Sequence, residues 1–477
     1  MAKSDEKLLV GPRLRRFRTS MGITQARMAS DLGISTSYLN LMERNQRALS
    51  AKVLLKMAEI YDFDLAGFTG AGDAHLVAEV YEAMRDPLFK GASISKSEAE
   101  DIVSSSPNAA RALLKLYSNH RDQALRASEV GADRDKVELL EQTGEAVESV
   151  RRFIHANRNH FDALNRAAEK LAGEIGFNKA FVVSALTDRL RDKHGLSVRI
   201  VPIDIMPQML RYFDRHSKRI NLSELLPQSG RRFQLAFQIG MLEHRELIDA
   251  ITASANLPGR EAEGLCRTNL ANYFAAAVLM PYGRFFKEAE QCKYDIDLLA
   301  HRFGTSFEQT AHRLTTLQRP DARGVPFFFI RIDVAGNVSK RFSAGRFHFS
   351  KFGGACPLWN IHECFSTPGQ TLTQVIQMPD ETTYFSIARM VSRSNGTFNA
   401  PSQKFAIGLG CDIAYAPRLI YAQGRGIDTS APTPIGTNCY LCERQNCRQR
   451  AHAPLNKTLS FDPRARGVSL FTFKDED

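Results

Sequence analysis

Residues 24–46 constrain the local fold of this chain more strongly than any other segment. Its first half places apolar residues on one face of a short helix: Met28, Ala29 and Leu32. Gly33 is expected to end that helix, because glycine takes a positive φ without steric cost. Thr24 and Ser35 are placed to cap this helix and a second one that follows it. Two short helices joined by a glycine turn predict a helix-turn-helix.

The start of the second helix is polar, and there a helix-turn-helix meets base edges in the major groove. The residues predicted to lie against DNA at this point are Ser35, Thr36, Ser37, Tyr38 and Asn40. Gln25, at the start of the first helix, is placed to reach a phosphate with its side chain and backbone N–H. Arg44 and Arg47 follow the second helix, where a positive charge adds affinity for any DNA sequence. The alternative is a plain helical hairpin within a bundle.

Two further helices are expected around this pair, over residues 10–21 and 51–61, with Arg18 among the outward basic residues of the first. Residues 11–70 hold nine Lys and Arg against five Asp and Glu, within a chain of net charge +11. This basic excess lies where a polyanion would dock. Residues 11–65 resemble the xenobiotic-response-element class of repressor DNA-binding domains, which implies double-stranded operator DNA as a partner.

At 477 residues the chain exceeds what one hydrophobic core can hold, and roughly three domains are expected. No apolar run reaches the length of about 18 residues that a membrane helix needs, and the first residues do not form a signal peptide. We therefore predict a cytoplasmic protein with no membrane partner. Composition suggests a multidomain α+β fold with these boundaries: 1–70 for an all-α DNA-binding domain, 71–165 for a helical connector, 166–322 for an α/β domain and 323–477 for a strand-rich domain.

The connector favours one or two long amphipathic helices over residues 133–175. Their apolar positions are Val137, Leu140, Val147, Val150, Ile154 and Phe161. One interpretation is a dimer seam, so that the protein acts as a homodimer. The alternative, that this face packs only within its own chain, is left equally open.

Residues 196–203 and 218–226 have the β-branched character of strands, and residues 231–243 read as a buried helix. This order is similar to the zinc-peptidase-like domain of the ImmA/IrrE family, whose helix carries His-Glu-x-x-His for zinc and its catalytic base. The matching positions here are Phe237, Gln238 and Met241. With neither ligands nor base, we predict a protein that is not an enzyme, whose peptidase-like domain senses a ligand. The rival interpretation is a metalloprotease-like regulator.

The helix expected over residues 260–280 would cover the pocket of such a sensor. It holds polar residues among apolar neighbours, the mixture that lines small-molecule sites. The candidate ligand-binding residues are Arg267, Asn269, Asn272 and Tyr273. A structural core helix would show the same mixture if the polar groups of its side chains were hydrogen-bonded within the protein.

The strand-rich segment from residue 326 onward holds a second chemical signal. Cys439, Cys442 and Cys447 form Cys-x₂-Cys-x₄-Cys, which places three soft thiolates on one loop and indicates a metal site. His452 could complete a Cys₃His zinc site. Alternatively, a cysteine distant in sequence supplies the fourth thiolate of an iron–sulfur cluster. The best candidate for that role is Cys411, between glycine-rich neighbours, and the next is Cys356.

Nearly the whole chain resembles one family, the short-chain fatty acyl-CoA regulators, which are bacterial transcription factors. The segments that carry the resemblance are residues 270–282, 294–320, 333–343, 352–360 and 435–451. The resemblance implies a central region that responds to propionyl-CoA or acetyl-CoA and a [4Fe–4S] cluster on the terminal cysteines, with zinc as the alternative. A redox- or iron-sensing repressor without an acyl-CoA ligand is the other alternative.

Overall fold

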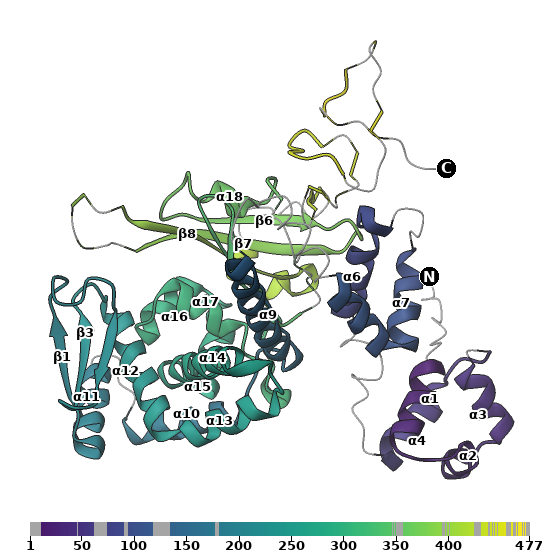
Figure 1. The fold of residues 1–477 in the computed structure, drawn as a ribbon, viewed down its shortest axis with the longest axis horizontal. Coiled ribbons are helices and arrows are strands. Elements are labelled where there is room, and N and C mark those ends of the chain that lie inside the picture. Colours follow the sequence, from purple (N-terminus) through teal and green to yellow (C-terminus); the bar gives the residue numbers. More distant parts are fainter. Residues whose placement is uncertain are drawn as a thin grey trace. The chain divides into compact units, whose positions relative to one another are not determined.

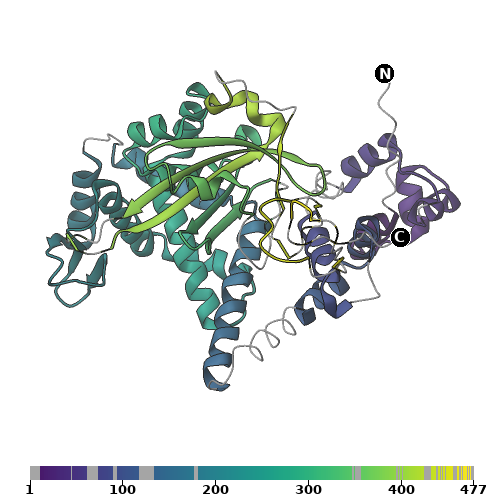
Figure 2. The ribbon, with the colours of Figure 1, turned by 90° about the horizontal axis from the view of Figure 1, so that it is seen from above.

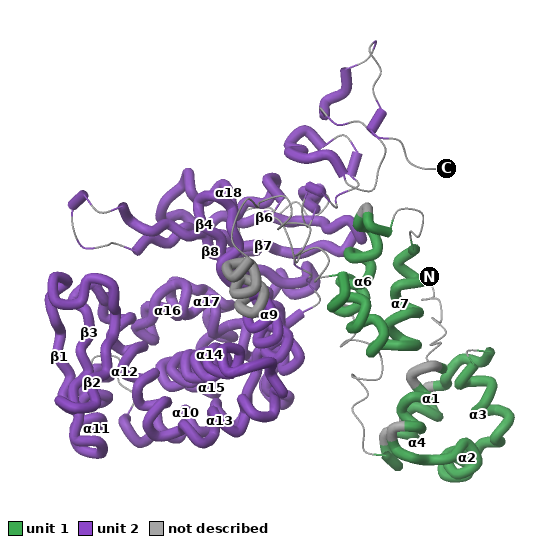
Figure 3. The backbone as a smooth tube through the Cα atoms, in the orientation of Figure 1, with its two compact units in different colours: residues 1–131, 455–458 green, residues 132–454, 459–477 purple. Residues whose placement is uncertain are grey.

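The computed structural model describes most of the chain: residues 11–44, 46–61, 74–89, 94–117, 134–176, 181–345, 356–393, 401–423, 431–436, 447–454 and shorter pieces between 347 and 473. The chain forms two compact units (Figure 3). One contains residues 1–131 with 455–458, and the other contains residues 132–454 with 459–477.

The first unit opens with a bundle of four helices (Figure 1). They are α1 (Gly11–Ser20), α2 (Gln25–Leu32), α3 (Thr36–Glu43) and α4 (Ala51–Tyr61). Leu14, Met28, Leu39 and Met57 are fully buried at its centre. The helices predicted over residues 10–21 and 51–61 are confirmed, because local apolar periodicity and capping determine them. A separate apolar cluster follows on α6 (Ala74–Met84) and α7 (Lys96–Ser105).

The second unit begins with helices around a three-stranded sheet. The helices are α9 (Arg134–Ala156), α10 (Asp162–Glu174), α11 (Val182–His194), α12 (Gln228–Glu243), α13 (Arg245–Ser254) and α14 (Gly259–Leu279). The sheet has the order β1 (Ser197–Val201), β3 (Arg219–Ser223), β2 (Arg211–Asp214), with β1 parallel and β2 antiparallel to β3. Two strands and α12 confirm the sequence prediction. The sequence did not indicate β2, which is too short to show periodicity.

The central helix of this region is α14, against which α9, α10, α12 and α13 all pack. The α9 side chains Ala146, Val150 and Ile154 are buried in the same core as α14. Packing within the chain therefore accounts for this part of the predicted dimer seam. Val147 is exposed, and the side chains of Val137 and Leu140 lie outside the described residues. The homodimer stays a prediction.

A six-stranded sheet completes the second unit (Figure 2). Its order is β5 (Val338–Ser343), β4 (Phe328–Asp333), β8 (Gln403–Asp412), β7 (Thr383–Arg393), β6 (Thr371–Gln377), β9 (Thr433–Pro434). The neighbours are antiparallel except for β9, which runs parallel to β6. One face packs on α15 (Tyr282–Gln291), α16 (Ile296–Phe303) and α17 (Phe307–Leu314). The other face is covered by the segment around Trp359.

Burial on both faces explains why the central strands are apolar without alternation. Phe328 points to one face and Phe329 to the other, and each is at most 1% exposed. Burying a side chain of this kind stabilises the fold by about 1.5–3 kcal/mol. Gly410 is required by close approach, because a Cβ there would lie 2.3 Å from the Phe328 ring.

These elements confirm a multidomain α+β fold with an N-terminal helix-turn-helix and a strand-rich C-terminal part. In the described part of the chain, no helix combines the length and the apolar composition needed to cross a bilayer.

Candidate functional site

The helix-turn-helix is built as its local sequence predicts. The Thr24 side chain accepts a hydrogen bond from the Arg27 backbone N–H, and Ser35 accepts one from that of Tyr38. Gly33 has φ 65°, the left-handed conformation that ends α2. The caps satisfy N–H groups that the first turns of α2 and α3 would otherwise leave unpaired.

One side of α3 is buried and the other faces outward. Leu39 and Met42 pack in the core of the bundle. Except for Gln25, the residues predicted to meet DNA lie on or just beyond α3 and are called the polar strip: Ser35, Thr36, Ser37, Arg44 and Arg47 are exposed, and Tyr38 and Asn40 are half-buried. The Arg47 guanidinium lies 5.0 Å from the centre of the Tyr38 ring. The strip offers hydroxyl, amide and guanidinium groups, which are the donors and acceptors that base edges and phosphates require.

A buried ion pair fixes the two helices relative to α1. Arg18 donates from Nε to Glu43 Oε1 at 2.6 Å, and Gln25 donates from Nε2 to Glu43 Oε2 at 2.7 Å. Arg18 is therefore not outward, and that expectation was wrong: the long side chain turns inward to the buried carboxylate. The Gln25 side-chain amide likewise donates one N–H to Glu43, so its backbone N–H is the more available donor for a phosphate. Sequence periodicity on α1 cannot reveal this pair, because its partners are 25 positions apart.

Burial by itself raises the pKa of Glu43, but hydrogen bonds from Arg18 and Gln25 outweigh burial and hold the pKa below its usual value. A lowered carboxyl pKa stabilises the fold above the unfolded pKa of about 4.3, and this stability is lost as pH falls through the folded value. Glu43→Gln is expected to reduce the local unfolding free energy of residues 11–61 by about 3 kcal/mol, because Arg18 is left half-buried without its anion.

Hydrogen–deuterium exchange of the full chain measures this local free energy. The control is Glu59→Gln, which neutralises an exposed carboxylate on α4 and should change exchange little. Equal protection in Glu43→Gln and the wild type at pH 7 would contradict the assigned role of the pair.

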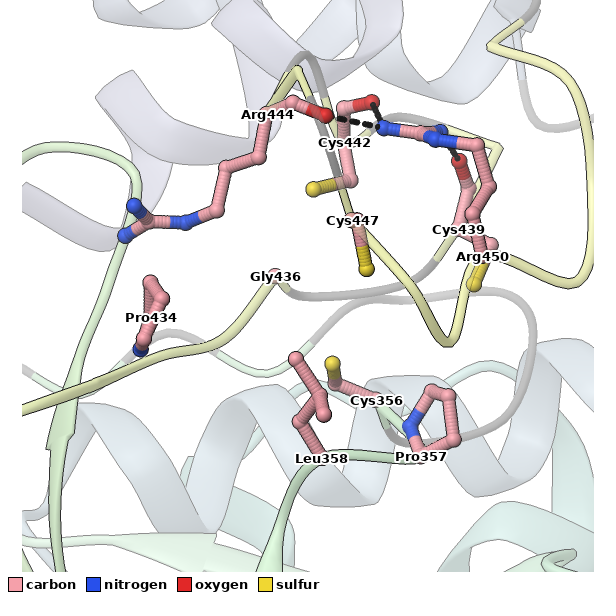
Figure 4. A pocket seen from close by; sticks show the side chains of 10 residues that line it. All are labelled: Cys356, Pro357, Leu358, Pro434, Gly436, Cys439, Cys442, Arg444, Cys447 and Arg450. Atoms are coloured by element: carbon pink, nitrogen blue, oxygen red, sulfur yellow. Dashed lines mark hydrogen bonds between the residues drawn. The ribbon is translucent and has the colours of Figure 1, made fainter. Parts of the chain in front are cut away.

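The second site is a pocket lined by four cysteines (Figure 4). Cys439, Cys442 and Cys447 come from the C-terminal loop, and Cys356 faces them from the segment that precedes α18 (Asn360–Glu363). Cys356 and Cys442 are buried, whereas Cys439 and Cys447 are half-buried. Burial raises the pKa of the Cys356 thiol, and the nearby Cys442 and Cys439 raise it further.

Both walls of the pocket are attached to strand β6. Gln374 accepts a hydrogen bond from the Asn360 backbone N–H and donates one to the Leu358 carbonyl, which fixes the Cys356 segment. Arg444 donates to the carbonyls of Gln377 and Met378, which fixes the cysteine loop at the end of the same strand. The strand therefore holds together ligand candidates that lie about 80 residues apart in sequence.

The structure does not bring Cys411, the first choice for a fourth ligand, to the other three cysteines. Cys411 lies on β8, where alternate side chains point to opposite faces of the sheet. It packs with Phe385 and Leu409 on the helix-covered face, whereas Cys356 packs with Trp359 on the other face. Burial raises the pKa of the Cys411 thiol to about 12, as expected for a core cysteine. Cys356, the second choice from sequence, lines the pocket together with the three loop cysteines.

His452, the alternative ligand of a zinc site, is turned to another neighbour. Its ring stacks on Tyr440 with the centroids 4.2 Å apart and the planes 11° from parallel. His452 is exposed and is not among the residues that line the cysteine pocket. The pocket thus brings together four thiols without an imidazole.

The spacing of the thiols bears on which group they fit. Among the described residues, no three His, Cys, Asp or Glu side chains converge closely enough to hold a single metal ion. A zinc site needs its four ligands about 2–2.3 Å from one centre. In an iron–sulfur cluster each thiolate binds a different iron, so the thiolates stand further apart. Four cysteines around one pocket are a donor set that suits either an iron–sulfur cluster or zinc.

The peptidase-like domain has lost the chemistry of a metal site. Phe237 and Gln238 are buried on α12 at the positions where the resemblance places a zinc ligand and the base. The Arg211 guanidinium lies over the Phe237 ring at 4.1 Å, and burial lowers the pKa of Arg211 to about 10. At the position where the peptidase family has a zinc ligand, this chain therefore has an aromatic ring that contacts the Arg211 guanidinium.

The four residues predicted to bind a ligand do not share one environment. Arg267 donates to Asp249 and Glu263, and Asn269 donates to the Leu265 carbonyl of its own helix. Tyr273 is buried, and Asn272 is half-buried. The contacts of Arg267 and Asn269 favour a structural role, and ligand contact stays a prediction.

The Tyr273 hydroxyl belongs to an internal network. It accepts hydrogen bonds from Asn165 Nδ2 at 2.7 Å and from the Phe161 backbone N–H at 3.1 Å. Asn165 in turn accepts from Arg313, a fully buried cation that also donates to the Met280 carbonyl. These bonds join α10, α14 and α17. The Tyr273 hydroxyl is therefore hydrogen-bonded inside the core, as is usual for a buried polar group.

Three family models match successive parts of the chain. Residues 14–68 match a helix-turn-helix, residues 191–315 match the IrrE N-terminal-like domain, and residues 316–471 match the C-terminal model of the short-chain fatty acyl coenzyme A regulators. A solved Mycobacterium tuberculosis transcriptional regulator has a TM-score of 0.66 and 40% identity, covering 69% of this chain and 99% of that chain.

Several transcriptional regulators match nearly the whole chain. The propionyl-CoA carboxylase regulator of Cereibacter sphaeroides is 40% identical over 98% of this chain and 100% of its own length. The HTH-type transcriptional regulators RamB and PrpR of Mycobacterium tuberculosis are each 38% identical over 98% of this chain and over 99% and 96% of their own lengths. These names confirm the prediction of a regulator rather than an enzyme. The chain belongs to the short-chain fatty acyl coenzyme A regulators, a family of helix-turn-helix transcriptional regulators.

Proposed function

We propose that this protein is a cytoplasmic, homodimeric transcription factor that controls genes of propionyl-CoA or acetyl-CoA metabolism. Its first domain binds a two-fold operator, a short-chain acyl-CoA adjusts that binding, and a [4Fe–4S] cluster occupies the cysteine pocket. The observation that carries the proposal is the capped α2–α3 pair with its exposed polar strip. The name of the Cereibacter sphaeroides relative supports the metabolic assignment.

DNA contact would follow the usual division of labour in a helix-turn-helix. Ser37 and Asn40 face the bases, because they lie on the outward side of α3 beyond its cap. Arg44 and Arg47 meet phosphates and supply affinity that does not depend on sequence. Two copies of the domain would read half-sites about one helical turn apart.

An anionic effector has a candidate contact in the peptidase-like domain. Arg211 is largely buried beside Phe237, and its Nη1 atom has no hydrogen-bond acceptor among the described residues. A buried cation without an acceptor is costly unless a ligand supplies one. Phosphate groups of an acyl-CoA have the required charge and acceptor oxygens. Arg211 therefore replaces the α14 residues as our first candidate for ligand contact.

The cysteine pocket would hold the cluster through Cys356, Cys439, Cys442 and Cys447. Bound there, the cluster supplies a link between the C-terminal loop and the sheet, together with one-electron redox chemistry. The chain's own part is to present four thiolates from two segments that β6 fixes in place. An anaerobic absorbance spectrum distinguishes a cluster from zinc, which is colourless.

The test measures operator binding by full-length protein of known iron, sulfide and zinc content. The operator is selected from a random-sequence duplex pool, and propionyl-CoA, acetyl-CoA, free coenzyme A and propionate are added separately. An acyl-CoA is expected to change the operator Kd by about 5- to 150-fold, the usual range of coupling between sites. Arg211→Gln should raise the effector concentration needed by about 10-fold, the cost of one charged hydrogen bond.

The matched control is Arg215→Gln, which removes the same charge from an exposed position four residues away and should leave the response unchanged. If Arg211→Gln responds as the wild type does, the anionic contact lies elsewhere. A response to oxidant but to no acyl-CoA would favour the redox-sensing alternative. Failure to select any operator would contradict the regulator itself.

A further inference from the structure

The Arg450 side chain donates hydrogen bonds to four backbone carbonyls of the cysteine loop, residues 439–452. Its Nη1 donates to the carbonyls of Cys439 at 3.1 Å and His452 at 3.4 Å. Its Nη2 donates to the carbonyls of Cys442 at 2.8 Å and Arg444 at 2.7 Å. One planar guanidinium thus holds four carbonyls of a loop that has no regular secondary structure in its described residues. Figure 4 draws the bonds to Cys439, Cys442 and Arg444.

The Arg450 side chain is deeply buried, yet one of its donors has no acceptor in the described part of the chain. The residue is 8% exposed, and the Phe473 ring lies 5.2 Å from the guanidinium carbon. Its Nε is buried and finds no acceptor among the described residues. Each of its four hydrogen bonds goes to a neutral carbonyl, so no carboxylate among these partners balances the charge. Burying such a charge costs free energy that a nearby anion would offset.

The second arginine of the pocket has a different task. Arg444 donates from Nε to the Ile435 carbonyl and from Nη2 to the Gln377 and Met378 carbonyls. These acceptors belong to the strand edge, so Arg444 ties the loop to the sheet. Arg450 organises the loop internally and lines the same pocket as the four thiols. Thiolates that bind a metal group would supply negative charge beside Arg450.

We propose that Arg450 is a positioning and charge-compensating residue for the iron–sulfur cluster. Its four carbonyl contacts hold Cys439 and Cys442 in the orientation that presents their sulfurs. Its charge, and the Nε–H left over, stabilise the sulfur ligands of the cluster. The inference rests on the proposed cluster but adds a residue that the cysteine pattern does not indicate.

Two separate consequences follow from this assignment. Net charge and hydrogen bonds to sulfur set the reduction potential of such a cluster. Removing a positive charge disfavours the reduced form, which carries one more negative charge, so the potential should fall. Loss of the four-carbonyl contact should independently loosen the loop and shorten the time for which the cluster is retained.

The experiment uses full-length protein reconstituted anaerobically with ferrous iron and sulfide. Arg450→Gln removes both the positive charge and the guanidinium N–H donors. Arg450→Lys removes the guanidinium but keeps the positive charge. The control is Arg448→Gln, which makes the same charge change at an exposed position two residues away. Midpoint potential is measured by redox titration, and cluster retention by the decay of visible absorbance under a chelator.

Arg450→Gln is expected to lower the midpoint potential and to lose its cluster at least about 10-fold faster, the usual scale for an outer partner of a metal ligand. Arg450→Lys should keep a potential near the wild-type value but also lose its cluster faster. Arg448→Gln should match the wild type in both. If Arg450→Gln cannot be loaded at all while Arg448→Gln can, the positioning role is supported.

A wild-type potential and wild-type retention in Arg450→Gln would overturn the proposal, as would equal effects in Arg448→Gln. Wild-type protein that takes up zinc but no iron would refute the cluster itself, and with it this role. Operator binding measured on the same samples keeps that failure separate from failure of the regulator assignment.

Discussion

Cys356→Ser is expected to yield a protein without iron or acid-labile sulfide, although Cys439, Cys442 and Cys447 are all intact. The physical reason is that a serine hydroxyl stays protonated where a thiol gives the thiolate that iron requires. The remaining three thiolates sit on a single loop, so the link between the loop and the sheet is lost as well. Metal analysis and the visible spectrum of anaerobically purified, full-length protein measure the effect.

Cys411→Ser is the matched control. It makes the same atom change at a buried cysteine on the opposite face of the sheet. Iron and sulfide content should equal those of the wild type, at a modest cost in stability from burying a hydroxyl. Loss of iron in Cys411→Ser with retention in Cys356→Ser would reverse the assignment of the fourth ligand. Loss in neither variant would show that the three loop cysteines bind metal without a fourth thiolate.

The second large effect is expected at the recognition helix. Ser37→Ala combined with Asn40→Ala should weaken specific operator binding by at least about 10-fold, since each lost base contact costs about 1–3 kcal/mol. Binding to nonspecific DNA should change little, because neither side chain carries charge. Kd values for the selected operator and for a scrambled duplex, at one fixed salt concentration, separate the two effects.

Two variants make this test discriminating. Ser30→Ala changes an exposed serine on α2 and should leave both Kd values unchanged. Arg47→Gln should weaken binding to operator and scrambled DNA alike and reduce the slope of log K against log salt by about 1. A double variant that binds its operator as tightly as the wild type would refute base contact by α3.

The exposure of the recognition residues was predictable because their neighbours in sequence determine it. Buried Leu39 and Met42 fix which side of α3 faces inward, and Ser35 fixes where the helix begins. By contrast, nothing local predicts that Arg18 turns inward, since its partner Glu43 lies two helices away. The same limit affects Tyr273, whose hydroxyl partner Asn165 is 108 positions away.

The amino-acid sequence by itself determined the helix-turn-helix, the absence of His-Glu-x-x-His at Phe237 and Gln238, and the close spacing of three thiols on one loop. Each feature involves residues that are close together in the sequence. Helix propensity, capping and residue spacing therefore determine it without help from distant segments. Only the tertiary structure shows that Cys356, and not Cys411, lies beside the three loop cysteines. Both are cysteines near glycines, and the choice depends on which face of a six-stranded sheet each one reaches. Strand order and register fix that face, and both arise from packing between distant segments.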